Sequence, residues 1–154
     1  MEKVIYNISV GNTSDIDTIA RFQVDMALES EGTALDIERV TAGVAAAVAD
    51  ENKGTYIIAR GASGNAIGSL MLTREWSDWT NRWYWWIQSV FVTKEYRGKG
   101  VYRAMYDKVK SLAKESNITQ IRLYVDKTNY PAQKVYQKLG MEETHYLLYE
   151  EVIC

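Results

Sequence analysis

The fold of this chain is decided by the stretch Val90-Phe91-Val92-Thr93-Lys94-Glu95-Tyr96-Arg97-Gly98-Lys99-Gly100-Val101-Tyr102-Arg103, an apolar strand that runs through a glycine-rich turn into a helix. Gly98 and Gly100 have no Cβ, so the backbone there can take unusual angles and approach a ligand closely. A helix that begins near Gly100 presents unpaired N–H groups at the positive end of its dipole. The stretch therefore predicts an anion site, and phosphate is the typical ligand.

The charge of this turn is local. Four basic residues crowd it and only Glu95 opposes them, whereas the whole chain carries a formal net charge of -2. The basic residues are Lys94, Arg97, Lys99 and Arg103. A concentrated positive charge on a weakly acidic chain indicates a binding site.

Two common phosphate motifs do not fit the turn. A kinase-like P-loop needs Ser or Thr after Gly-Lys, but Lys99 is followed by Gly100. A dinucleotide fingerprint needs a third glycine where Arg103 stands. The remaining pattern, Arg97-x-x-Gly100-x-Tyr102, resembles the acyl-coenzyme A pyrophosphate loop of the GNAT acetyltransferase superfamily, although that family usually has Gly or Ala where Tyr102 stands. The alternative is a basic turn that caps an ordinary helix.

A second motif lies downstream and resembles the same superfamily. Asn129, Ala132, Tyr136 and Gly140 match its Asn-x-x-Ala-x-x-x-Tyr-x-x-x-Gly signature at every named position. Asn129 is a good helix N-cap, Pro131 fits the first turn, and Gly140 is suited to end the helix. The two motifs together span roughly the C-terminal half of the chain, and their joint spacing is more specific than either motif alone.

Composition sets limits on the fold and on the partners. With 154 residues, 47% of them hydrophobic and 25% charged, the chain is expected to form a single domain over residues 1–154. No apolar run is long enough to span a membrane and no signal pattern opens the chain, so we expect a cytoplasmic protein without a membrane partner. One cysteine and one histidine predict no metal site, and the acidic balance argues against a nucleic-acid partner.

Periodicity predicts helices and strands in an order that matches the GNAT fold. The resemblance implies an α/β (α+β) fold, with a mixed central sheet of six to seven strands and about four helices. Helices are expected from Ser14 and from Asp36, after Gly100 and after Asn129. Strands are expected over residues 4–10, 54–60, 67–73, 83–92 and 118–125, with one or two further strands closing the sheet between residues 140 and 153.

The resemblance implies an acetyl-CoA-dependent N-acetyltransferase that moves an acetyl group to a primary amine of a small molecule or to an exposed amino group, by direct attack in a ternary complex. By resemblance, a splayed strand end at Ser89, Val90 and Phe91 turns a backbone N–H toward the thioester carbonyl, and Tyr136 meets the leaving thiolate, mainly by hydrogen bonding because tyrosine is a weaker acid than a thiol. The implied cofactor contacts are Val90, Phe91, Val92, Arg97, Gly98, Lys99, Gly100, Val101, Tyr102, Arg103, Asn129 and Tyr136.

The general base is where the sequence departs from familiar family members. Many of them carry a Glu where this chain has Gln88, and a neutral amide cannot take a proton. Gln88 is therefore expected to orient a water or the substrate. The candidates for proton removal are Glu29, Glu31, Asp78 and His145, and the terminal position of Cys154 argues against a covalent acetyl-cysteine route. Gln88 and Tyr102 also leave open a non-catalytic acyl-CoA sensor or binding module.

All five tryptophans lie between Trp76 and Trp86. Strand alternation assigns Trp83 and Trp85 to one face and Trp86, with Tyr84, to the other, so most of them are expected in the core or in an interface. Trp76 and Trp79, expected in the connection between two strands, could form with Asp78 an aromatic, acidic wall for a cationic amine. They could equally cover a dimer contact, which leaves monomer and homodimer open.

Overall fold

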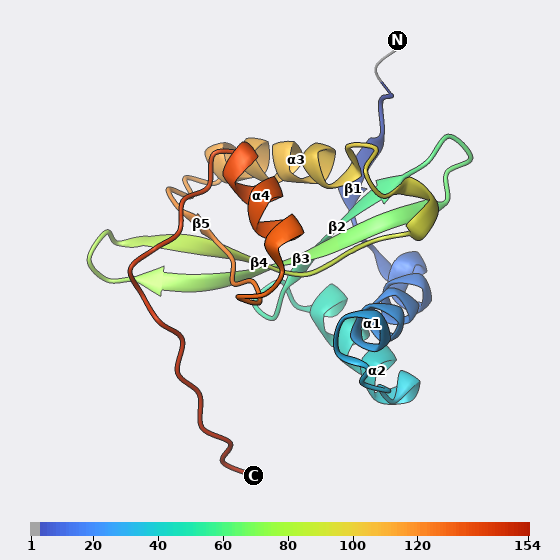
Figure 1. The fold of residues 1–154 in the computed structure, drawn as a ribbon, viewed down its shortest axis with the longest axis horizontal. Coiled ribbons are helices and arrows are strands. Elements are labelled where there is room, and N and C mark those ends of the chain that lie inside the picture. The colour runs from blue at the N-terminus through green and yellow to red at the C-terminus, as the bar shows by residue number, and fades with distance from the viewer. Residues whose placement is uncertain (1–3) are drawn as a thin grey trace. The chain divides into compact units, whose positions relative to one another are not determined.

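The computed structural model describes residues 4–154 (Figure 1). The chain divides into two compact units, one ending at Leu123 and the other comprising Tyr124–Cys154, and each unit is described separately. Within the described residues, no helix combines the length and the apolar character needed to cross a membrane.

The first unit is built on a mixed sheet of five strands in the spatial order β1-β2-β3-β4-β5. Neighbouring strands run antiparallel except β4 and β5, which are parallel. The strands are β1 (Asn7–Val10), β2 (Thr55–Arg60), β3 (Ala66–Ser77), β4 (Arg82–Val92) and β5 (Ile121–Arg122). The expected strand over residues 118–125 is thus much shorter in the structure.

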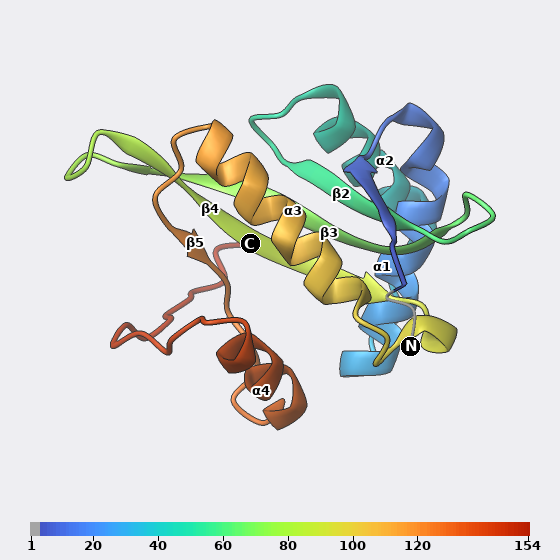
Figure 2. The same cartoon turned by 90° about the horizontal axis from the view of Figure 1, so that it is seen from above.

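Helices cover both faces of this sheet. The helices α1 (Ile16–Glu31) and α2 (Ile37–Ala49) lie on one face, and α3 (Val101–Glu115) lies on the other (Figure 1). Figure 2 shows α3 lying across the sheet. Two short 3-10 turns, η1 (Thr13–Asp15) and η2 (Lys94–Tyr96), precede α1 and follow β4.

Each layer has an apolar stripe that explains its packing. Ile19 and Ala20 of α1 cluster with Val44 of α2 and with Tyr56 and Ile58 of β2, all of them buried. On the other face, four buried residues of α3 recur every four positions and form one helical stripe, which Tyr106 widens: Val101, Met105, Val109 and Ala113. The glycine of β3 at position 68 lets α3 approach, because a Cβ there would meet Val101 at 3.2 Å and Met105 at 3.4 Å.

Local capping starts the helical segment with η1, whose N-cap Asn12 lies two residues before the expected start at Ser14, and α1 itself begins at Ile16. Asn12 accepts a hydrogen bond from the backbone of Ser14, and Asp15 accepts one from the backbone N–H of Asn12, at 2.9 and 3.0 Å. This capping box starts η1, which leads into α1. Asp15 is buried, and Arg60 of β2 pairs with it at 2.8 Å, which ties the helix start to the sheet.

The second unit contains one helix, α4 (Tyr130–Lys138). Its predicted signals are confirmed: the Asn129 side chain accepts from the N–H of Ala132 at 3.2 Å, Pro131 lies in the first turn, and Gly140 has a φ of +93°. The N–H of Met141 then donates to the carbonyl of Tyr136 at 3.0 Å, which closes the helix end.

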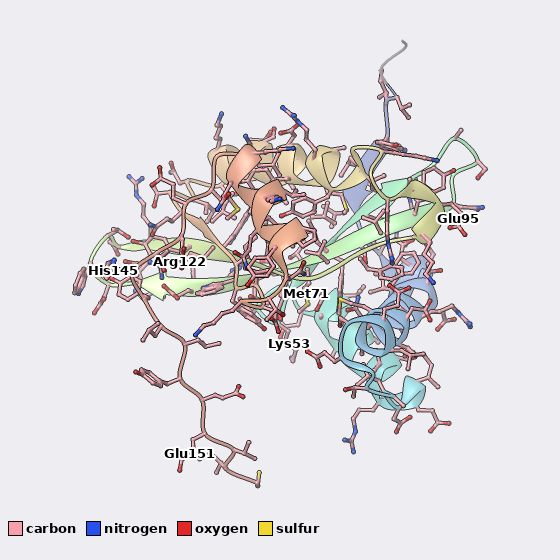
Figure 3. All side chains as sticks on the ribbon, in the orientation of Figure 1. Lys53, Met71, Glu95, Arg122, His145 and Glu151 are labelled. Carbon is pink, nitrogen blue, oxygen red and sulfur yellow. The ribbon has the colours of Figure 1, made fainter. Side chains whose placement is uncertain are left out.

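The expectation that residues 140–153 close the sheet is wrong. No strand follows β5 in the described chain, so the sheet has five strands rather than six to seven. The tail is exposed, and Glu151 is among the side chains that Figure 3 draws along it. The reason lies in its pattern: Tyr146-Leu147-Leu148-Tyr149 is followed by two glutamates, so apolar and polar residues do not alternate and no register is fixed.

Candidate active site

The strand β4 carries an extra residue near its C-terminal end. Ser69 of β3 pairs with Phe91, whereas Met71 pairs with Gln88, so Ser89 and Val90 together face a single residue of β3. Ser89 has a φ of +55°, in the left-handed region that non-glycine residues rarely adopt. A bulge of this kind bends the strand and turns its backbone groups out of the ladder.

The other side of β4 is open at the same end. In the described residues, the parallel ladder to β5 joins only Trp85 to Ile121 and Trp86 to Arg122. From Ile87 to Val92, β4 pairs with no residue of β5, and on this unpaired stretch the Val92 carbonyl accepts a hydrogen bond from Arg97. Ser89, Val90 and Phe91, where the sequence predicts a splayed strand end, lie in this part of β4.

The turn of residues 94–100, here called the glycine loop, fits a phosphate ligand. Gly98 and Gly100 have φ angles of +74° and +81°, and a Cβ at either would meet nothing within 4 Å. Gly100 is the N-cap of α3, and no side chain caps this helix start. Open space in front of an uncapped helix N-terminus with basic neighbours is suited to an anion.

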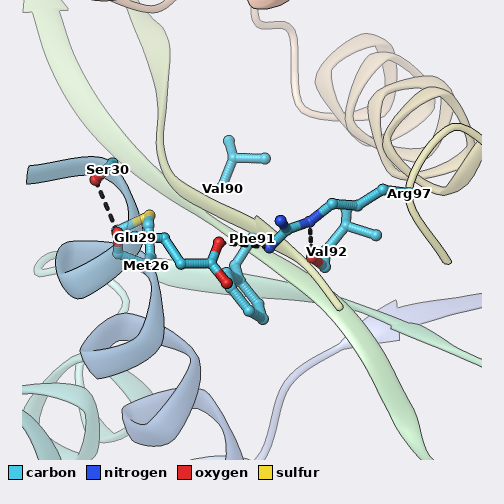
Figure 4. A pocket seen from close by; sticks show the side chains of 7 residues that line it. All are labelled: Met26, Glu29, Ser30, Val90, Phe91, Val92 and Arg97. Atoms are coloured by element: carbon cyan, nitrogen blue, oxygen red, sulfur yellow. Dashed lines mark hydrogen bonds and ion pairs between the residues drawn. The ribbon is translucent and has the colours of Figure 1, made fainter. Parts of the chain in front are cut away.

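A pocket of about 300 Å³ lies between α1 and the end of β4 (Figure 4). The structure brings together in it four of the predicted cofactor contacts with Glu29, one of the candidates for proton removal. Its lining is Met26, Glu29, Ser30, Val90, Phe91, Val92 and Arg97.

Two hydrogen bonds within the protein fix the side chain of Arg97. Its Nη2 lies 2.7 Å from Oε2 of Glu29, and its Nε donates to the carbonyl of Val92 at 2.8 Å. Its guanidinium also lies 5.5 Å from the ring centroid of Phe91. Lys94 is a second cation near Glu29, at 3.9 Å. Arg97 thus links α1 to the glycine loop, and its charge still adds to the positive field of the loop.

Gln88 lies on the same sheet face as Thr73 and donates to the Thr73 hydroxyl at 3.1 Å. Along this face, Glu75 accepts from Trp86 Nε1 at 3.1 Å and from Arg122 at 2.9 Å. Sequence reasoning did not single out Thr73, Glu75 or Arg122. The signal was the alternation of Thr73 and Glu75 in β3, which becomes informative only once the register against β4 is known.

The tryptophans are not core residues. Trp76, Trp79 and Trp83 are 49%, 93% and 40% exposed, and Trp85 and Trp86 are half-buried. Trp76 lies within β3 rather than in the connection, because it pairs with Trp83 across the hairpin, with ring centroids 5.0 Å apart. The predicted alternation of Trp83 and Trp85 against Trp86 is confirmed by the register.

The structure does not bring Trp76, Trp79 and Asp78 to the pocket. They lie near the β3–β4 turn, where β4 begins, whereas the pocket lies at the C-terminal end of β4. Trp76 pairs with Trp83, and Val90 of the pocket lies seven residues further along β4, a separation of about 23 Å.

The remaining predicted site residues lie at the start of α3 and in the second unit. Tyr102 in the first turn of α3 stacks on Tyr106, with centroids 6.2 Å apart, so the ring packs along the helix. Val101 is buried beneath this turn, and Arg103 is exposed. In the second unit, Tyr136 is half-buried, and burial raises its pKa above the ordinary value of 10.0.

Of the candidate bases, Glu29 alone lines the pocket. Glu31 and Asp78 are exposed, and His145 belongs to the tail, where its ring lies 4.2 Å from that of Tyr146. The described residues hold no group of three or more His, Cys, Asp or Glu side chains that could bind a metal ion together.

Comparison with solved structures finds the same fold in other proteins. A possible acetyltransferase from Clostridium difficile 630 is 39% identical, with a TM-score of 0.90 over 98% of this chain and 99% of that one. Two more distant structures share the fold. A predicted acetyltransferase with acetyl-CoA from Clostridium acetobutylicum is 22% identical, with a TM-score of 0.75 over 96% of each chain. The ribosomal-protein-alanine N-acetyltransferase from Brucella melitensis biovar Abortus 2308 is 16% identical, with a TM-score of 0.77 over 97% of this chain and all of that one.

No curated protein matches the sequence significantly. The model of the acetyltransferase (GNAT) family matches residues 18–141, which include β4, its bulge and the glycine loop. Enzymes of this family transfer acyl groups, so membership favours catalysis over the non-catalytic module that the sequence left open. The chain belongs to the GNAT acetyltransferase family and is an acyltransferase.

Proposed function

We propose that this enzyme transfers the acetyl group of acetyl-CoA to a primary amine, on a small molecule or on an exposed amino group. The observation that carries the proposal is the joint arrangement of the β4 bulge, the pocket beside it and the glycine loop. GNAT acetyltransferases use acetyl-CoA, and one structure of this fold is described with acetyl-CoA.

The glycine loop would hold the pyrophosphate. Gly98 and Gly100 leave room for phosphate oxygens, and the first N–H groups of α3, from Val101 to Arg103, point out of the helix start. Lys99 and Arg103 would add positive charge. The pantetheine arm would lie along the open side of β4, beside the backbone of Val90, Phe91 and Val92.

The reaction requires stabilisation of charge on two atoms. As the amine nitrogen bonds to the carbonyl carbon, negative charge grows on the carbonyl oxygen, and a backbone N–H of the bulge would donate to it. The carbon–sulfur bond then breaks, the sulfur leaves as a thiolate and the nitrogen loses a proton. By the family motif, Tyr136 would donate a hydrogen bond to the sulfur, and its raised pKa keeps that hydroxyl protonated.

Deprotonation of the amine does not use Gln88 as a base. Its amide donates to Thr73 and can orient a water or the acceptor. Glu29 is the carboxylate at the pocket, and we propose that it accepts a hydrogen bond from the ammonium form of the acceptor beside its ion pair with Arg97. The proton would then leave through water.

The test is release of free CoA thiol from acetyl-CoA in the presence of panels of polyamines, amino acids, aminoglycosides and peptides with free N-termini. Mass spectrometry of the acceptor should show a gain of one acetyl group. Acetyl-CoA binding without transfer to any acceptor class would contradict the proposal and would favour an acyl-CoA sensor instead.

A further inference from the structure

A residue that precedes β1 forms a hydrogen bond to the backbone of the glycine loop. The hydroxyl of Tyr6 donates to the backbone carbonyl of Lys99 at 2.8 Å, across 93 positions of sequence. Tyr6 is half-buried, and the Lys99 side chain turns elsewhere, with its Nζ 5.6 Å from the ring centroid of Tyr96. The contact therefore acts on the backbone of the loop.

This contact sets the direction of a donor in the proposed phosphate site. The peptide bond between Lys99 and Gly100 is planar and trans, so the N–H of Gly100 points opposite to the carbonyl of Lys99. With that carbonyl bound to Tyr6, the N–H of Gly100 is directed away from Tyr6.

The loop needs such a constraint because glycine does not provide one. Gly100 has a φ of +81°, and a glycine reaches positive and negative φ with similar ease. The peptide unit beside it can therefore rotate unless something fixes it. Among residues 4–154, no side chain caps α3 at Gly100, and the hydrogen bond from Tyr6 binds the carbonyl of this peptide.

We propose that Tyr6 is a positioning residue for the acyl-donor site: it fixes the Lys99–Gly100 peptide so that the Gly100 N–H is already directed at the pyrophosphate. This inference rests on the proposed function of the glycine loop. It concerns affinity for the diphosphate part of the donor and not the chemical step, which takes place at the end of the pantetheine arm.

The experiment compares Tyr6→Phe with the wild type on two acyl donors, acetyl-CoA and S-acetyl-pantetheine, which lacks the pyrophosphate. The variant should bind acetyl-CoA about fivefold more weakly, which corresponds to the roughly 1 kcal/mol of one hydrogen bond. Its kcat at saturating acetyl-CoA and its kcat/KM with S-acetyl-pantetheine should equal those of the wild type. The matched control is Tyr149→Phe, because the Tyr149 side chain is 87% exposed. This variant should keep the wild-type affinity and kinetics with both donors.

Equal affinity of Tyr6→Phe and wild type for acetyl-CoA would overturn the inference. An equal loss with both donors would also overturn it, because a general structural defect would then explain the effect. If the wild type itself binds no acetyl-CoA, the proposed function fails. That result differs from the case in which the wild type binds acetyl-CoA and Tyr6→Phe binds it equally well, which contradicts only the role of Tyr6.

Discussion

Tyr136 combines a family position with a physical property suited to its proposed role. Burial raises its pKa above 10.0, so the hydroxyl stays protonated and able to donate at neutral and moderately alkaline pH. Tyr136→Phe keeps the ring and removes the donor. We expect kcat to fall about 100-fold while the Kd of acetyl-CoA stays the same. Isothermal titration and initial rates with a proven acceptor measure the two quantities.

The pH profile of the wild type checks the same residue. Since the pKa of Tyr136 is raised, kcat should show no alkaline decline caused by this group below about pH 10. Turnover by Tyr136→Phe at the wild-type rate would exclude Tyr136 from the chemistry.

At the scale of the elements, the bulge in β4 is the feature on which the proposed chemistry depends. Ser89 has a φ of +55°, which costs a non-glycine residue about 1 kcal/mol, and Ser89→Gly relieves this cost but frees the backbone. We expect the free energy of unfolding to change by less than about 1 kcal/mol and kcat to fall about tenfold, because the bulge N–H is less well aimed. Urea unfolding and steady-state kinetics measure the two effects.

The matched control for the bulge is Asn81→Gly, because Asn81 has a φ of +54° in the β3–β4 turn at the other end of the strand. This variant should keep the wild-type kcat. If Ser89→Gly also keeps it, the bulge does not supply the donor.

The sequence predicted some elements better than others. Features that depend on residues within one turn were predicted, whereas features that depend on contacts between strands were missed. The helix α4 was predicted well because Asn129, Pro131 and Gly140 act on their own turns. The place of Trp76 in β3 was missed, since its pairing with Trp83 is a cross-strand contact.

Within the candidate site the same distinction holds. The glycine loop was recognisable from its residues, whereas the links of Glu29 to Arg97 and of Tyr6 to Lys99 join segments 68 and 93 positions apart. No local pattern encodes such contacts. The tail failed as a predicted strand for a related reason: strand formation needs a partner edge, and four consecutive apolar residues do not specify a register.

For the whole molecule, buried tyrosines predict a loss of stability in alkali. Burial raises the pKa of Tyr56, which lies in β2 and packs against α1 and α2, and it raises the pKa of Tyr106 in α3, where the charge of Asp107 adds to the effect. The unfolded chain then loses these protons at lower pH than the folded chain. Their contribution is complete below about pH 10 and is lost as pH rises through the folded pKa values. Tm should therefore fall as pH rises above about 10.

Tyr106→Phe removes one of these groups, so the fall of its Tm with pH should be shallower than that of the wild type. The exposed Tyr149 provides the control, and Tyr149→Phe should keep the wild-type slope. Identical slopes for Tyr106→Phe and wild type would show that this side chain does not contribute to the alkaline transition.

Binding of the acetyl-CoA diphosphate by the glycine loop can be tested by calorimetric titration of acetyl-CoA into the wild type, Gly100→Glu and Gly64→Glu. Both glycines have positive φ, +81° and +87°, and both have open space around a Cβ, but Gly64 lies in the β2–β3 turn. We predict binding by the wild type and by Gly64→Glu, and its loss in Gly100→Glu, where a carboxylate occupies the phosphate position. No binding by the wild type, or equal binding by all three proteins, would contradict the account.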